Sequence, residues 1–93
     1  MFAIVIYDVA SKKDTKVLKL LRKYLIHVQK SVFEGELTPA QLKLIKEEIS
    51  RLNLDHDTDS VLIYTTLSDK AIQKHVLIGE DPENYVLGFE PRK

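Results

Sequence analysis

Two stretches of this chain are apolar on both of the faces that a β-strand presents to its surroundings. Residues 2–8 (Phe-Ala-Ile-Val-Ile-Tyr-Asp) and residues 60–66 (Ser-Val-Leu-Ile-Tyr-Thr-Thr) are rich in β-branched and aromatic side chains and contain no glycine or proline, as is typical of strands. A strand that is apolar on both faces has to be covered on both sides. We expect one domain, residues 1–93, and a domain this small has few elements with which to cover a second face.

Two further segments repeat apolar residues at helical spacing, as amphipathic helices do. The first spans residues 12–27, with Ser11 as its expected N-cap and Asp14 in its first turn, where the helix dipole favours a carboxylate. The second spans residues 39–52, and the run 38–41 (Thr-Pro-Ala-Gln) predicts a capping box at its start. These segments are the candidate cover for one face of a sheet.

The remaining segments are short. Residues 28–37 have strand composition with a glycine near the end, which predicts two extended pieces joined by a tight turn or a bulge. Residues 68–74 predict one helical turn. Residues 75–78 and 85–89 predict two short strands, separated by the turn-rich connection 79–84.

The order of these elements predicts an α+β sandwich of the ferredoxin-like βαββαβ type, with an extra C-terminal strand. In that architecture both helices cover the same face of the sheet. The opposite face of strands 2–8 and 60–66 is also apolar, and it would form a sizeable exposed patch if it were bare. A second copy packed sheet face to sheet face about a two-fold axis is the simplest cover, so we expect a homodimer.

Composition limits the function further. The chain has no cysteine, which excludes disulfides and thiolate metal sites. No segment is long enough to cross a membrane and no signal peptide is recognisable, so we expect a cytoplasmic protein with no membrane partner. The net charge is zero, but residues 1–35 hold seven basic and three acidic side chains, against seven and eleven in residues 36–93. A polyanion would meet the first third of the chain, although chance also produces such an asymmetry.

Asp8 ends the first apolar run and shares a strand face with Phe2, Ile4 and Ile6. If the following helix covers the other face, Asp8 points toward the partner subunit, and a nearby two-fold axis would bring the two copies of Asp8 together. Two carboxylates can hold one Mg²⁺ with waters and a substrate phosphate, and such an ion can activate water for attack on a phosphodiester. The alternative is that Asp8 only caps, or adds charge to, the start of the helix.

Residues 7–9 (Tyr-Asp-Val) and the run 28–37 (Val-Gln-Lys-Ser-Val-Phe-Glu-Gly-Glu-Leu) resemble the small CRISPR-associated adaptation protein, the Cas-two family. The likeness covers nearly the whole chain. It implies a ferredoxin-like homodimer in which the C-terminal segment, residues 75–93, pairs across to the other subunit. It also implies a divalent metal held by Asp8, and action on nucleic acid. Members of the family are described as metal-dependent endonucleases of RNA or DNA, and as the non-catalytic dimer that integrase subunits bind during spacer integration.

Two departures from the family pattern bear on these implications. Relatives often carry arginines in the first turns of the first helix, where this chain has lysines, and lysine contacts phosphate without the bidentate fork of arginine. Relatives also often have a glycine after the tyrosine that matches Tyr24, where this chain has Leu25. The second departure leaves the shape of the turn from helix to strand open.

Basic and aromatic side chains are the candidate contacts to nucleic acid. The expected phosphate contacts lie on or beside one stripe of the first helix: Lys12, Lys13, Lys16, Lys19, Arg22 and Lys23. Phe33 could stack on a base, and Ser31 could hydrogen-bond a phosphate near the metal, which makes Ser31 the second candidate catalytic residue beside Asp8. The alternatives are a solvated helix face, a Phe33 packed in the dimer interface, and a Ser31 that satisfies only backbone groups.

These features predict a Mg²⁺-dependent endonuclease of CRISPR adaptation that acts on single-stranded RNA, double-stranded DNA or both. A non-catalytic adaptor that binds DNA and bridges integrase subunits is the alternative. A ferredoxin-like regulatory domain for a small ligand is a weaker third reading, since no ligand loop is recognisable. Residues 55–59 (Asp-His-Asp-Thr-Asp) resemble the opening of a calcium loop, but Ser60 and Thr66 replace its glycine and its closing glutamate, so we expect no calcium site.

Overall fold

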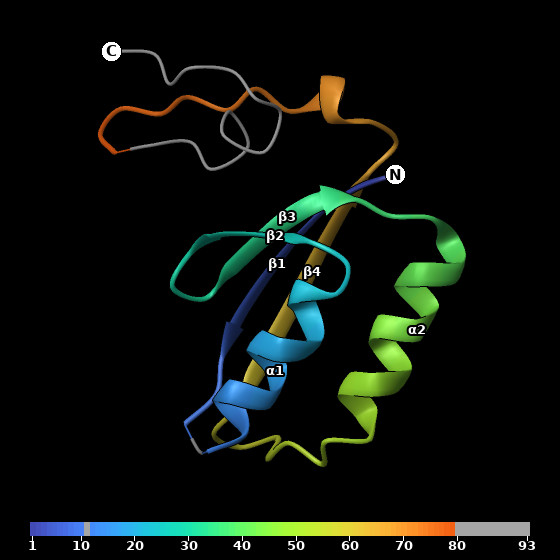
Figure 1. Ribbon diagram of the computed structural model, residues 1–93, viewed down its shortest axis with the longest axis vertical. Helices are drawn as coiled ribbons and strands as arrows, with labels where there is room; N and C mark the ends of the chain where they lie inside the picture. The colour runs from blue at the N-terminus through green and yellow to red at the C-terminus, as the bar shows by residue number, and fades with distance from the viewer. Residues whose placement is uncertain (11, 80–93) are drawn as a thin grey trace.

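A four-stranded sheet in the order β2-β3-β1-β4 carries two helices on one face in the computed structural model, which describes residues 1–10 and 12–79 (Figure 1). The strands are β1 (Phe2–Asp8), β2 (Ile26–Gln29), β3 (Val32–Glu36) and β4 (Ser60–Thr66), and the helices are α1 (Lys13–Arg22) and α2 (Pro39–Ser50). All neighbouring strands are antiparallel. The element order and this sheet confirm the predicted α+β class and βαββαβ arrangement.

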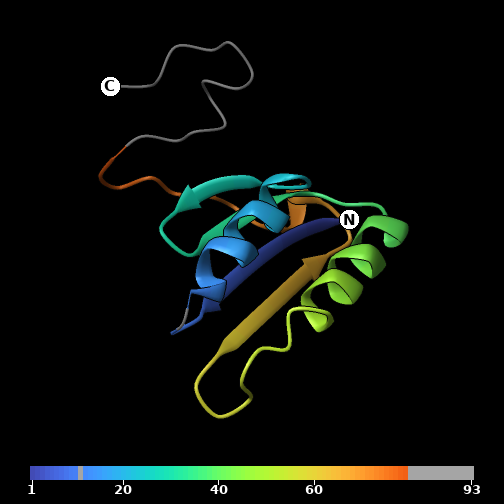
Figure 2. The ribbon, with the colours of Figure 1, turned by 60° about the horizontal axis from the view of Figure 1, so that its bottom comes forward.

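The core lies between the sheet and the two helices, which lie side by side over the same face in both ribbon views (Figures 1 and 2). On β1 the core face consists of Ala3, Val5 and Tyr7, each at most 3% exposed. Buried side chains from the helices complete the same cluster: Val17, Leu20, Leu21 and Ile45. Because side chains alternate along a strand, Ile6 and Asp8 fall on the opposite face, as the sequence predicted.

The face opposite the helices keeps large apolar side chains exposed. Ile6 is 39% exposed, and Leu62 and Tyr64 of the neighbouring strand β4 are 50% and 56% exposed. Leu62 lies directly across from Ile6 in the β1–β4 ladder. The apolar second face that the sequence predicted is therefore present, while the homodimer expected to cover it stays a prediction.

The first helix is shorter than its periodicity predicted. α1 ends at Arg22, and Ile26 and His27, which were expected in the helix, pair with β3 instead. The apolar residues near the helix end fit a helical and an alternating pattern equally well, and the ladder with β3 decides between them by satisfying the backbone groups. α1 begins after Lys12 without a side-chain cap, and Ser11 lies outside the described residues.

The start of α2 confirms the predicted capping box. The Gln41 amide donates to Thr38 Oγ1 at 3.1 Å, and the Thr38 amide donates to Gln41 Oε1 at 2.9 Å. Pro39 stands at the start of the helix, where its missing N–H costs nothing. Two of the backbone donors at this helix end are thereby satisfied by side chains.

We expect Thr38→Ala to lower the free energy of unfolding by about 1 kcal/mol, because it removes the acceptor for the Gln41 amide. Urea denaturation of the two proteins measures the difference. Thr38→Ser keeps a hydroxyl at the same position and should remain close to the wild type. Equal losses in the two variants would contradict a role for the cap.

The segment 28–37 contains the predicted pair of extended pieces. A bulge interrupts the β2–β3 ladder between His27 and Gln29, and a turn at Lys30 and Ser31 joins the strands. Gly35 has a φ of +154°, and a Cβ there would lie 3.2 Å from Leu25 Cδ2. A side chain at position 35 would strain the backbone and crowd the turn that follows α1.

Beyond β4 the prediction is confirmed in part. A 3-10 turn, η1, covers Asp69–Ala71 inside the predicted range 68–74. Residues 75–78 form no strand within the described chain, and the expected pairing of this segment with the other subunit stays a prediction. The predicted strand 85–89 lies outside the described residues. No helix in the described ranges is long and apolar enough to cross a membrane.

Candidate functional site

Asp8 is the last residue of β1, at the point where the sheet gives way to the loop before α1. Its ladder partner is Ser60, the first residue of β4. Its side chain is exposed and lies on the sheet face that the helices leave uncovered. The N-cap residue of α1, Lys12, makes no side-chain cap hydrogen bond, and the alternative that Asp8 caps or adds charge to the start of this helix stays untested.

One chain supplies only part of a metal site at this point. Within residues 1–10 and 12–79, no three His, Asp or Glu side chains lie close enough together to hold an ion. An exposed carboxylate is nevertheless a suitable donor for Mg²⁺, which is usually held by one or two carboxylates while waters and substrate oxygens complete its octahedron. Asp8 therefore fits one share of a Mg²⁺ site and needs a further donor from elsewhere.

The turn between β2 and β3 brings Ser31 to the end of β1. The Tyr7 amide donates to the carbonyl oxygen of Ser31 at 3.0 Å. The carbonyl oxygen of Lys30 accepts from His27 Nε2 at 2.9 Å and from the Tyr7 hydroxyl at 3.4 Å. These contacts fix the turn that carries Ser31, the second predicted catalytic residue, beside the residue that precedes Asp8.

Tyr7 keeps the proton that it donates to this turn. Burial is the main reason that the pKa of the Tyr7 phenol is raised, the negative charge of Asp14 adds to the effect, and Arg22 opposes it. Ser31 itself is half-buried, and its hydroxyl makes no hydrogen bond within the described ranges. An open surface hollow of about 520 Å³ adjoins the turn and is lined by Gln29, Lys30, Ser31 and Val32. Its position leaves room for a ligand near the Ser31 hydroxyl.

Phe33 does not face a ligand or a partner. Its side chain is 0% exposed, because the register of β3 places it opposite Val5 on the core face. Its ring stacks on His27, with centroids 4.5 Å apart, and lies 6.2 Å from the ring of Tyr7. Base stacking by Phe33 and its alternative, a place in the dimer interface, are both wrong for this fold.

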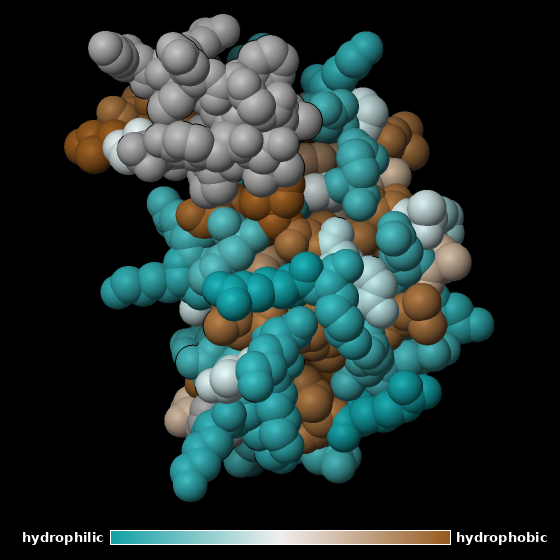
Figure 3. Space-filling view, in the orientation of Figure 1, coloured by the Kyte–Doolittle hydropathy of each residue, from teal (hydrophilic) through white to brown (hydrophobic). Residues whose placement is uncertain are grey.

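The basic residues predicted to contact phosphate divide into two groups. Four are exposed and form no ion pair among the described residues: Lys12, Lys16, Lys19 and Arg22. In Figure 3, hydrophilic side chains cover much of the surface over α1. Lys13 Nζ donates instead to the carbonyl oxygen of Asn53 at 2.8 Å, and Lys23 Nζ meets Glu48 at 2.6 Å. The second group thus ties α1 to neighbouring segments.

Glu48 links the end of α1 to α2. Its Oε1 accepts from Lys23, and its Oε2 accepts from the Tyr24 hydroxyl at 2.9 Å. The hydrogen bond from Lys23, followed by that from Tyr24, lowers the pKa of Glu48 below its usual 4.5. The same bond to Glu48 raises the pKa of Tyr24. The hydrogen bond to Glu48 also raises the pKa of Lys23, so Lys23 and Glu48 keep their charges and Tyr24 keeps its proton.

A carboxyl group whose pKa is lowered by folding stabilises the folded state above its unfolded pKa, and this contribution disappears as the pH falls through the folded pKa. We expect the stability difference between the wild type and Glu48→Gln to shrink as the pH is lowered from about 6 to about 3. Thermal melts over this range measure it. Glu47→Gln, which removes the same charge one residue away, is the control, and a constant wild-type advantage at low pH would contradict the assignment.

Asp59, in the loop before β4, holds the backbone that follows Asp8. Its Oδ1 accepts from the Ala10 amide at 2.9 Å, and its Oδ2 accepts from the Asp55 amide at 2.9 Å. These backbone bonds, the Ala10 bond first, lower the pKa of Asp59. The sequence predicted only a solvated loop here. The available signal was the position of Asp59 directly before a strand that neighbours β1.

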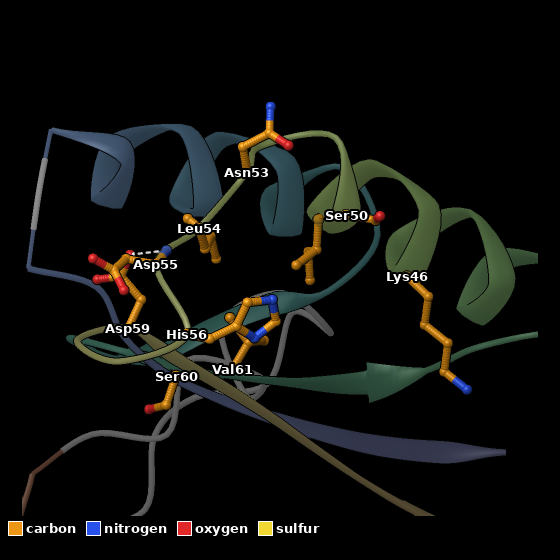
Figure 4. A pocket seen from close by; sticks show the side chains of 10 residues that line it. Lys46, Ser50, Asn53, Leu54, Asp55, His56, Asp59, Ser60 and Val61 are labelled. Atoms are coloured by element: carbon orange, nitrogen blue, oxygen red, sulfur yellow. Dashed lines mark hydrogen bonds between the residues drawn. The ribbon is translucent and has the colours of Figure 1, made fainter.

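A cavity of about 670 Å³ lies between α2, the loop 53–59 and the start of β4 (Figure 4). Three of its lining residues are apolar, Ile49, Leu54 and Val61, and the others are polar. Asp59 contributes to the lining with both oxygens already bonded to backbone amides, and Asp55 Oδ1 accepts from the Asp57 amide at 2.8 Å. The loop thus uses these carboxylates for its own conformation, and the cavity includes none of the predicted site residues.

Comparison with known proteins gives consistent matches over most of the chain. The family model described as CRISPR associated protein Cas2 matches residues 1–75. The CRISPR-associated endoribonuclease Cas2 of Nanoarchaeum equitans is 39% identical over 83 residues, 89% of each chain. That of Thermotoga maritima is 44% identical over 84 residues, 90% of this chain and 95% of the relative.

Solved structures agree with the sequence matches. A crystal structure of Cas2 with 42% identity superimposes with a TM-score of 0.76 and covers 87% of this chain and 88% of its own. Cas2 of Streptococcus pyogenes, with 31% identity, gives a TM-score of 0.68 over 82% of this chain and 100% of its own. The arrangement of strands and helices is thus shared with these proteins.

Proposed function

Because the chain belongs to the family of CRISPR associated protein Cas2, we propose that it is a Mg²⁺-dependent endonuclease of CRISPR spacer adaptation that hydrolyses phosphodiester bonds. Relatives that it matches over most of their length are named endoribonucleases, so single-stranded RNA is the first substrate to test and double-stranded DNA the second. The observation that carries the proposal is Asp8, an exposed carboxylate at the end of β1 on the uncovered face of the sheet.

The proposed enzyme is a homodimer. The exposed side chains of Ile6, Leu62 and Tyr64 form an apolar patch next to the end of β1 that carries Asp8. Burying such a patch against its own copy about a two-fold axis removes apolar surface from water in both chains. An axis near the end of β1 would bring the two Asp8 carboxylates together as the pair that one chain lacks.

Three groups of residues would bind the metal and the substrate phosphates around that pair of carboxylates. The two Asp8 carboxylates would hold Mg²⁺, which when bound supplies a Lewis acid and a water of lowered pKa. The Ser31 hydroxyl would donate to a phosphate oxygen beside the site, and the turn contacts made by Tyr7 hold the backbone that carries it. The exposed cations of α1 would hold the flanking phosphates: Lys12, Lys16, Lys19 and Arg22.

The test is cleavage of labelled single-stranded RNA and double-stranded DNA by the purified protein, with Mg²⁺ and with excess EDTA. We expect cleavage that depends on Mg²⁺ and weakens steeply as salt rises, because phosphate contacts release counterions. Cleavage that is unchanged in EDTA, or no cleavage of either substrate, would overturn the proposal. A wild type that binds DNA without cutting it would favour the alternative below.

The alternative is a non-catalytic dimer that binds DNA and bridges integrase subunits during spacer integration. The segment after β4 favours it, because Leu67, Leu77 and Ile78 are 97%, 91% and 96% exposed, and exposed apolar runs are a common docking surface. This function predicts that spacer acquisition in cells survives Asp8→Ala but is lost when the residues after Gly79 are removed. It also predicts loss when Leu77 and Ile78 are replaced by aspartate, which removes the exposed apolar side chains themselves. Loss of acquisition by Asp8→Ala in a folded dimer would count against the adaptor.

A further inference from the structure

One carboxylate ties together two loops that are distant in the sequence. Asp59 Oδ1 accepts from Ala10, 49 positions away, and Asp59 Oδ2 accepts from Asp55, so the group uses both oxygens on backbone amides at 2.9 Å. We call this pair of bonds the Asp59 clip. It joins the β1–α1 loop to the α2–β4 loop. A second contact, from Lys13 Nζ to the carbonyl oxygen of Asn53 at 2.8 Å, links the first residue of α1 to the same α2–β4 loop.

The clip acts directly beside the proposed site. Ala10 is the second residue after Asp8, and Ser60, which follows Asp59, is the ladder partner of Asp8. Asp8 is therefore held through the ladder on the β4 side and through the Ala10 amide on the loop side. Strand ends fray where backbone bonds stop, and β1 ends at Asp8 itself. Without the clip the backbone beyond Asp8 would lose its nearest fixed point.

We propose that Asp59 is a positioning residue, which fixes the backbone after β1 and thereby the direction of the Asp8 carboxylate. This inference rests on the proposed function in so far as Asp8 is the metal ligand. Asp59 does not touch the metal or the substrate, and it acts only through the Ala10 amide. Groups that orient a metal ligand from outside the coordination shell typically affect metal affinity or activity by about 10- to 100-fold when they are removed.

The test compares Asp59→Ala, which loses both bonds, with Asp59→Asn, which keeps one acceptor oxygen. Asp57→Asn is the matched control, because it removes the same charge from the same loop at an exposed side chain. We expect the Mg²⁺ concentration for half-maximal cleavage to rise about 10-fold in Asp59→Ala and less in Asp59→Asn. The rate at saturating Mg²⁺ should stay close to the wild-type rate, and Asp57→Asn should match the wild type throughout.

Two measurements need neither cleavage nor substrate. Amide hydrogen exchange should quicken by about 10-fold or more at Ala10 in Asp59→Ala, and ¹⁵N relaxation should report greater motion of residues 8–10. Mn²⁺ binding followed by electron paramagnetic resonance should weaken in parallel.

The outcomes separate this inference from the proposed function. Unchanged amide hydrogen exchange and unchanged ¹⁵N relaxation at residues 8–10 in Asp59→Ala would show that the Asp59 clip does not fix this backbone. Faster amide hydrogen exchange with an unchanged Mg²⁺ concentration for half-maximal cleavage would show that Asp59 is structural and does not position Asp8. A wild type that neither binds Mn²⁺ nor cleaves would overturn the proposed function, and the relaxation data alone would then decide whether Asp59 orders the segment that carries Asp8.

Discussion

Asp8→Asn is expected to lower the Mg²⁺-dependent cleavage rate by about 10³-fold, because it removes both carboxylates of the proposed site at once and with them several kcal/mol of transition-state stabilisation. Asparagine has nearly the same shape, and Asp8 is exposed, so stability should change by no more than about 0.5 kcal/mol. The rate is measured on labelled RNA and DNA at saturating Mg²⁺. Asp57→Asn, an exposed acid in another loop, is the control for charge.

A mixed dimer makes this prediction sharper. If the two copies of Asp8 share one ion, a dimer with one wild-type and one Asp8→Asn chain has lost half of its only site. This mixed dimer should then be nearly as inactive as the dimer in which both chains carry Asp8→Asn. Two independent sites would instead leave about half of the wild-type rate, since subunits that act alone contribute additively. Tagged chains purified in two affinity steps provide the mixed species.

Leu62→Glu is expected to raise the dissociation constant of the proposed homodimer by about 10²-fold or more, because it places two uncompensated charges near a two-fold axis. Leu62 is 50% exposed and lies across from Ile6 on the apolar patch, so each chain should still fold alone. Light scattering over a range of protein concentrations measures the mass, and circular dichroism checks the fold. Cleavage should fall with the dimer population although Asp8 is intact.

The matched control for this experiment is Thr65→Glu. Thr65 is exposed on the same strand, and its ladder partner Ala3 shows that it belongs to the helix-side face. It adds the same charge away from the patch and should leave the mass unchanged. A Leu62→Glu protein that remains a dimer, or a wild type that is a monomer at all concentrations, would contradict the proposed interface.

Patterns that depend on near neighbours predicted much of this fold. Alternation along residues 2–8 placed Asp8 on the face away from the helices, and the run 38–41 predicted the cap that Thr38 and Gln41 form. The bounds of β4 were predicted as residues 60–66. In each case the physical cause, a period of two or a cap across one turn, lies within a few residues.

Features that depend on distant pairing were missed. α1 ends at Arg22 because Ile26 and His27 join β3, and Phe33 is buried because it lies across from Val5. The Asp59 bond to Ala10 connects loops that no local pattern relates. Periodicity reports which residues share a face, but the register between strands decides which face and which neighbours, and register is a property of the assembled sheet.

The position of β1 in the sheet also bears on how the chain folds as it is synthesised. Phe2 begins β1, one of the two inner strands, and its ladder partners are Glu36 on one side and Thr66 on the other. β1 is synthesised before both of its partner strands, so it gains its second neighbouring strand only when Thr66 of β4 has been synthesised. Folding rates fall as such non-local pairings increase. Until Thr66 has been synthesised, one edge of the apolar strand β1 keeps its backbone N–H and C=O groups unpaired. A nascent chain in this state is most prone to pair with the wrong strand.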